Sequence, residues 1–209
     1  GAATYVGRIF FGIDPAFTVP SGVLPDLLFP SAAQFLPLYV FFGMICGIAA
    51  AGFIKFLHWV EDLFAANPLN PYVKNMIGMT FLGVMMYVFF TIYGRYFTDG
   101  VGYATIQDIL DGGMQVAYLM AILFFAKMVA TSVSLAAGAS GGVFSPSLFL
   151  GATLGGCFGA VLAGIWPNLG FGPIQFAIIG MAAIVGGGTG AAMTAILMIF
   201  EMTGDYMTI

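Results

Sequence analysis

Long apolar runs, interrupted by very few charges, are the feature of this sequence that most limits how the chain can fold. Only 7% of the 209 residues are charged and 61% are hydrophobic, whereas a soluble domain carries about 25% charged residues. A soluble fold would lack the polar side chains needed to cover its surface. Because backbone groups in lipid must pair internally, spanning segments of this length are helices. We therefore expect an all-α, polytopic membrane protein.

Four stretches are long enough to cross a bilayer, since a spanning helix needs about 20 apolar residues. They are residues 34–60 with an amphipathic continuation to 66, and residues 72–96, 116–137 and 143–166. Residues 104–110 are too short to span, and we expect a short or re-entrant helix there. Two further apolar pieces, 174–185 and 191–202, flank a glycine-rich segment and predict a broken pair of half-helices. Many transporters place substrate sites at such breaks.

The two ends of the chain suggest a piece of a longer protein. Residues 2–11 predict the end of a helix, and residues 14–30 form a Pro-rich loop. The chain opens on Gly-Ala-Ala without an initiator Met, and it stops at Ile209 just after a helical run. We therefore interpret residues 1–209 as a single, partial transmembrane domain, in which 1–33 precede the helices of 34–209.

Charge and metal-ligand content exclude several function classes. The net charge is −4 and the charges are scattered, so we expect no nucleic-acid partner. One His and two Cys leave no cluster for zinc or iron. Cys46 and Cys157 lie in apolar stretches, and we interpret them as small buried hydrophobes. We expect no metal and no cofactor.

A glycine-rich turn, residues 138–146, joins two predicted spans. Pro146 fits the first turn of the second helix, where its missing N–H costs nothing. The amides of Gly142, Val143 and Phe144 then precede or begin that helix and have no intrahelical acceptor. The helix dipole adds partial positive charge there, which makes the turn a candidate anion site. Taken by itself, such a turn is more often a tight packing turn.

Several motifs, in order along the chain, resemble those of the CLC family of chloride channels and chloride/proton antiporters. Gly141 to Pro146 reads Gly-Gly-Val-Phe-Ser-Pro, which is similar to the family's Gly-x-Phe-x-Pro signature. Other similar segments are Pro15-Ala-Phe-Thr-Val-Pro20, Gly100-Val-Gly-Tyr-Ala-Thr-Ile106, Lys127-Met-Val-Ala-Thr131 and Glu201-Met-Thr-Gly-Asp205. The resemblance covers nearly the whole chain. One departure is Gly190-Ala-Ala-Met193, where many members have Arg-Ala-Pro-Leu.

The resemblance implies a CLC-like inverted-repeat fold, of which this chain is most of the second half. It implies a homodimer with one anion pathway per subunit, in the cell's inner or plasma membrane. The anion-binding residues would be Gly142, Val143 and Phe144, with the Val143 and Phe144 amides on the central chloride. Gly141, Ser145 and Pro146 support the motif. The family's Ser, gating Glu and Tyr would lie outside residues 1–209.

Chloride and other small anions are thus the expected substrates, and we expect no enzymatic activity. An alternative is a non-transporting membrane assembly module. A second alternative is a rhomboid-like intramembrane serine protease, because Gly138-Ala-Ser140-Gly141 matches Gly-x-Ser-Gly. Such an enzyme needs a His on a later helix, but the single His58 precedes Ser140.

Four further features have structural interpretations. Lys127 lies within an apolar span, and we favour a cation bonded to helix C-terminal carbonyls over an electrostatic aid to anions. Gly151, Gly155 and Gly159 recur every four residues and predict close helix packing. Glu201 ends the last half-helix, where a structural boundary role is expected. His58 lies at an expected water boundary and is assigned no catalytic role.

Overall fold

The computed structural model describes Phe17 and residues 32–114, 116–166 and 172–203, with the backbone alone for 32–35. Within these residues every regular element is an α-helix. The helices are α2 (Ala32–Ala66), α3 (Pro71–Tyr93), α4 (Tyr103–Leu110), α5 (Ala117–Ala136), α6 (Phe144–Ile165), α7 (Pro173–Thr189) and α8 (Ala192–Thr203). The helix expected at 2–11 and most of the loop at 14–30 lie outside the described residues.

Four of these helices are long and apolar enough to cross a membrane, as predicted. They are α2 from Leu36, α3, α5 and α6. The first helix continues to Ala66 as expected. The second predicted span is too long by a few residues, because Gly94 adopts a left-handed conformation (φ 69°) and caps α3 after Tyr93. The 8-residue α4 is too short to span, as predicted.

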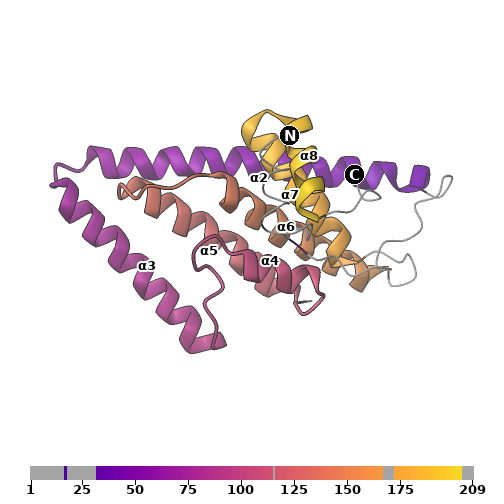
Figure 1. Ribbon diagram of the computed structural model, residues 1–209, viewed down its shortest axis with the longest axis horizontal. Helices are drawn as coiled ribbons and strands as arrows, with labels where there is room; N and C mark the ends of the chain where they lie inside the picture. The colour runs from indigo at the N-terminus through magenta and orange to yellow at the C-terminus, as the bar shows by residue number, and fades with distance from the viewer. Residues whose placement is uncertain (1–16, 18–31, 115, 167–171, 204–209) are drawn as a thin grey trace, which may run out of the picture.

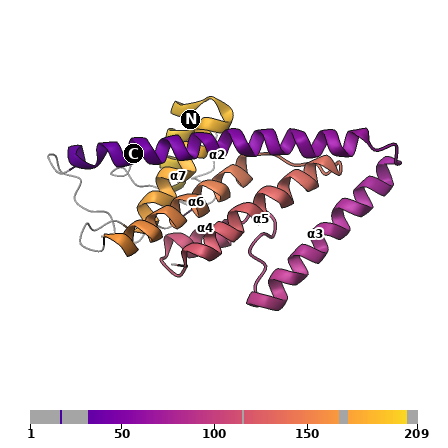
Figure 2. The ribbon, with the colours of Figure 1, turned by 180° about the vertical axis from the view of Figure 1, so that it is seen from behind.

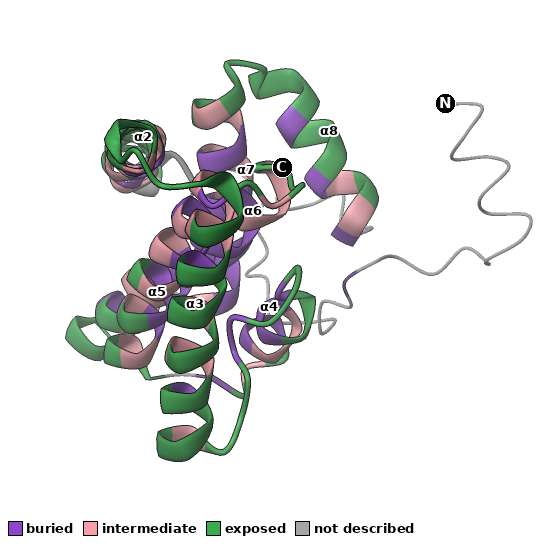
Figure 3. Ribbon diagram, turned by 90° about the vertical axis from the view of Figure 1, so that its left-hand side faces the viewer, coloured by how far each residue is buried: buried purple, intermediate pink, exposed green. Residues whose placement is uncertain are grey.

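Most of the helices form a bundle that lies against the long helix α2 and is inclined to it. Helix α2 runs along one side of the molecule, and α5, α6 and α7 cross beneath it (Figures 1 and 2). Helix α3 diverges from the bundle and contacts α5. Burial follows this arrangement, since α3 is largely exposed whereas α6 and α7 carry many of the buried residues (Figure 3). Helix α6 lies at the centre, in contact with α2, α4, α5 and α7.

A glycine stripe on α6 sets its distance from α7. A Cβ added at Gly151 or Gly155 would collide with the backbone of Gly180 or Phe176, and one at Gly159 would lie 2.7 Å from the Gly172 carbonyl oxygen. Small residues at every fourth position allow two helix backbones to approach this closely. The predicted packing role of the three glycines is confirmed. The contact fixes the direction of α6, and therefore of its N-terminus.

The break between the two half-helices lies later than predicted. Residues 186–188 are helical, and α7 ends only at Thr189, where Gly190 (φ 70°) caps it in a left-handed conformation. These glycines lie at close helix contacts, since ideal Cβ atoms at Gly186 and Gly187 would lie 3.3 Å from Ala192 Cα and from Ala50 Cβ, respectively. The glycines thus allow α8 and α2 to approach α7 and do not break it. The predicted pair of short helices is otherwise confirmed, with 17 and 12 residues.

Phe17 is buried within this bundle. It is 1% exposed and belongs to the main hydrophobic core. Its amide donates to the Met202 carbonyl oxygen at 2.8 Å, and its ring packs edge-on against Tyr103 with centroids 5.3 Å apart. Phe17 is therefore held between α8 and α4.

Candidate anion-binding site

The glycine-rich turn leads directly into α6. Phe144 is the first helical residue, and Val143 is the N-cap with φ −88° and ψ −10°. The first helical bond runs from the Ser147 amide to the Val143 carbonyl oxygen at 3.0 Å. Pro146 falls in the first turn, as predicted, where no N–H is needed. The predicted start at residue 143 is therefore displaced by a single position.

The amides at this end of α6 are unpaired. Within the described part of the chain, the N–H groups of Gly142, Val143 and Phe144 have no hydrogen-bond acceptor. Gly141, Gly142 and Val143 are exposed. Free amides at a helix N-terminus, together with the helix dipole, favour an anion. The arrangement can therefore bind a small anion through partial charges alone.

A pocket of about 500 Å³ opens beside this turn. Its walls come from α3, α5, the loop before α4, and the turn with the start of α6. It brings together four of the six predicted motif residues, namely Gly141, Gly142, Ser145 and Pro146. Val143 and Phe144 do not line it, and Phe144 packs partly against the main core. The predicted motif residues are therefore divided: some of them line the pocket, whereas Phe144 packs against the core.

The loop before α4 is held by hydrogen bonds from two sides. Ser145 Oγ on α6 donates to the Val101 carbonyl oxygen at 3.0 Å. Lys127 Nζ on α5 donates to the carbonyl oxygens of Thr98 at 3.1 Å and Gly100 at 2.7 Å. The bonding of Lys127 to carbonyls is as predicted, but these carbonyls belong to a loop and not to a helix C-terminus. Long-range bonds of this kind leave no signature in the sequence.

Thr98 is a pocket residue that sequence reasoning missed. It is 3% exposed and lines the pocket with Lys127. Its Oγ1 atom is buried and has no hydrogen-bond partner among the described residues. A single threonine in a loop offers no sequence signal for such burial.

The other residues considered in the sequence analysis do not contribute to this site. Nδ1 of His58 donates to the Ile54 carbonyl oxygen at 2.8 Å, within its own helix. Glu201 is exposed at the end of α8. Cys46 is buried and Cys157 half-buried, and both are free thiols. The described residues contain no group of three or more His, Cys, Asp or Glu side chains placed to hold a metal ion.

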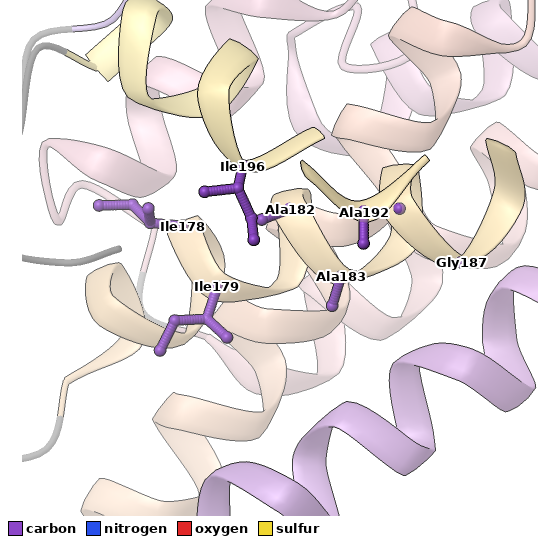
Figure 4. A pocket seen from close by; sticks show the side chains of 8 residues that line it. Ile178, Ile179, Ala182, Ala183, Gly187, Ala192 and Ile196 are labelled. Atoms are coloured by element: carbon purple, nitrogen blue, oxygen red, sulfur yellow. The ribbon is translucent and has the colours of Figure 1, made fainter. Parts of the chain in front are cut away.

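A second pocket, of about 320 Å³, lies between α7 and α8 (Figure 4). It is lined by Ile178, Ile179, Ala182, Ala183, Gly186, Gly187, Ala192 and Ile196. The side chains in Figure 4 are all aliphatic. Because it offers no polar side chain, this pocket is a poor place for an anion, and the N-terminus of α6 remains the candidate site.

The helices and this site define a class of protein. Long apolar helices with exposed apolar faces, short helices between them, and a polar pocket at a helix N-terminus are features of an integral, multi-pass membrane protein. The family follows from comparison of the sequence. The chain belongs to the voltage gated chloride channel family, whose sequence model matches residues 1–209.

Individual relatives agree with this assignment. The chain is 32% identical over 207 residues to the H(+)/Cl(-) exchange transporter ClcA of Vibrio campbellii, covering 99% of this chain and 42% of the relative. It is 30% identical over 223 residues to chloride channel protein CLC-f of Arabidopsis thaliana, covering 96% of this chain and 26% of the relative. The chain thus spans less than half of the length of either relative.

A solved structure shares the fold. A CLC-type fluoride/proton antiporter superimposes with a TM-score of 0.72 at 23% identity, covering 97% of this chain and 46% of the antiporter chain. The all-helical fold of broken and oblique helices is therefore that of a CLC membrane domain. The predicted family and fold class are confirmed.

Proposed function

We propose that the protein containing this chain transports chloride across a membrane, as a channel or a chloride/proton antiporter. The amides of Gly142, Val143 and Phe144 hold the anion in transit. The observation that carries this proposal is the set of three unpaired amides at the N-terminus of α6, of which those of Gly142 and Val143 belong to exposed residues. Substrates are chloride and other small monovalent anions.

A binding site made of partial charges suits a transported anion, because the anion must be released from the site after it binds. Amide dipoles hold a halide without a full charge, so that the bound ion can be released again. The nearby cation, Lys127, directs two N–H groups to the carbonyls of Thr98 and Gly100. The names of the relatives, an H(+)/Cl(-) exchange transporter and a chloride channel protein, support the same substrate.

The transport unit is larger than residues 1–209. We infer that this chain supplies most of the second half of an inverted-repeat domain and that the intact protein is a homodimer in the inner or plasma membrane. The share of the relatives that it spans, 42% and 26%, supports the first inference. The remaining anion contacts come from the other part of the protein.

The two alternatives have less support. A rhomboid-like protease would need a His near Ser140, but the single His58 precedes it and donates to its own helix backbone. A non-transporting assembly module is not suggested by the names of the relatives, which are an exchange transporter and a chloride channel protein. Transport accounts for both the amides and the family.

The proposal is tested by a substitution that removes one backbone N–H group and keeps the turn. Val143→Pro deletes the N–H at the N-cap, and Val143→Ala is the matched control that keeps it. Loss of one hydrogen bond to a charged partner costs about 1.5–3 kcal/mol, or about 10- to 100-fold in affinity. In liposomes containing the full-length protein, we expect V143P to reduce chloride flux at low chloride at least tenfold, and V143A to stay within about twofold. Equal flux from both variants would rule out the Val143 amide as an anion ligand.

A further inference from the structure

We propose that the pocket beside α6 contains a second anion position, formed by the Thr98 hydroxyl and the Lys127 ammonium group. This position is separate from the amides of Gly142, Val143 and Phe144. It rests on the proposed function only for the identity of the anion as a halide. Two buried polar side chains, whose hydrogen-bonding capacity is incompletely used, support this second position.

The first of these side chains is Thr98. It is 3% exposed and lines the pocket. Its backbone carbonyl accepts from Lys127 at 3.1 Å, but its Oγ1 atom has no partner among the described residues. Nearly all buried hydroxyls are hydrogen-bonded, so an orphaned one at a pocket wall points to a bound ion or water. As a donor with no protein acceptor, this hydroxyl suits an anion.

The second side chain is Lys127, which is also 3% exposed. Its ammonium group has three N–H donors, and two of them are directed to the carbonyls of Thr98 and Gly100. No carboxylate oxygen lies within 4.0 Å of Nζ in the part of the chain that the structure describes. The exposed Asp99 acts on the ammonium group electrostatically but forms no ion pair with it. Because no carboxylate is bonded to this buried cation, it favours an anion beside it.

Thr98 and the ammonium group of Lys127 are neighbours in the structure. Lys127 bonds to the main chain of Thr98 itself, and both residues line the same pocket. The Phe149 ring, with its centroid 5.2 Å from Nζ, covers another side of the ammonium group. We therefore expect an anion to approach from the pocket, which Lys127 lines. The remaining polar wall side chains are hydroxyls, such as Thr131 and Ser134.

The donor set indicates the class of ligand. One ammonium group and a few hydroxyls in an otherwise apolar pocket match a monovalent, weakly hydrated anion. Phosphate or sulfate would present more acceptor oxygens and more charge than these donors satisfy. The ligand is therefore a halide. It binds at this position, beside the turn that precedes α6, before or after it binds to the amides.

Crystals of the full-length protein soaked in bromide test this proposal by anomalous scattering. We expect a bromide peak within hydrogen-bonding distance of Thr98 Oγ1 and Lys127 Nζ in the wild-type protein. Thr98→Val removes the hydroxyl and keeps the backbone carbonyl, and we expect it to lower the occupancy of this peak at least fivefold. Thr98→Ser, the matched control, should retain the peak. The peak at the α6 amides should be unchanged in both variants.

Three results would overturn the proposal: water alone at this position, a side chain from the rest of the protein filling the pocket, or an unchanged peak in T98V. The wild-type map is decisive by itself should T98V fail to fold. Absence of this peak with bromide retained at the α6 amides would refute the second position and leave the proposed function intact. The reverse pattern would refute the amide site.

Discussion

The Ser145 hydroxyl donates a hydrogen bond to the Val101 carbonyl oxygen, 3.0 Å away and 44 residues earlier in the chain. This bond joins the first turn of α6 to the loop before α4. Lys127 on α5 holds two other carbonyls of the same loop. The amide end of α6 is therefore fixed relative to α5 before any anion arrives. Such preorganisation reduces the ordering cost of binding.

Replacing Ser145 by Ala should loosen this connection. A neutral hydrogen bond contributes about 0.5–1.5 kcal/mol, so we expect S145A to lower the free energy of unfolding of the full-length protein in detergent by about 1 kcal/mol. Ser140→Ala is the control, because Ser140 is exposed and lines the same pocket. A thermal unfolding midpoint that is lower for S140A than for S145A would contradict the role of the Ser145–Val101 bond.

Lys127→Met should have a larger effect. It removes two bonds from a charged donor to the carbonyls of Thr98 and Gly100, each of which is worth more than a neutral bond. Removal of the buried charge offsets part of the loss. We expect a net destabilisation of about 2–3 kcal/mol, measured by denaturant unfolding. The exposed Lys55 provides the control, since K55M should stay within about 0.5 kcal/mol.

Gly155→Ala should disrupt the packing of α6 on α7. The added Cβ would collide with the Phe176 carbonyl, and backbone cannot move aside cheaply. Overpacking of this kind costs about 1–3 kcal/mol, and it should also shift the N-terminus of α6. Gly164→Ala on the same helix meets nothing within 4 Å, so its better helix propensity should leave stability equal or slightly higher. Equal melting temperatures for G155A and G164A would argue against the close contact.

The ion pair between Arg95 and Asp108 should contribute little. Its atoms are 2.9 Å apart, but the two side chains are 66% and 41% exposed. Exposed pairs are screened by solvent and contribute about 0.2–1 kcal/mol. A double-mutant cycle with R95A and D108A should give a coupling energy below about 1 kcal/mol at physiological salt. A coupling well above this value would mean that another part of the protein buries the pair.

The spans and the motif could be predicted from sequence because their signals are local. Apolar length defined α2, α5 and α6, and Pro146 placed the start of α6. The end of α7 was mispredicted because a glycine run in a sequence resembles a helix break, whereas Gly186 and Gly187 lie within α7 where Ala192 and Ala50 approach it. The Thr98–Lys127 contact joins residues 29 apart, and no periodicity encodes it. The motif also gave no sign that Gly142 lines the pocket while Phe144 packs on the core.

We propose that the free amides of Gly142, Val143 and Phe144 bind the transported anion. An anomalous map of the full-length wild-type protein in bromide tests this directly. We expect a peak within hydrogen-bonding distance of at least two of these amide nitrogens, with weaker occupancy as chloride is added in competition. A lipid tail or a protein side chain packed against the amides at saturating bromide, with no peak there, would contradict it.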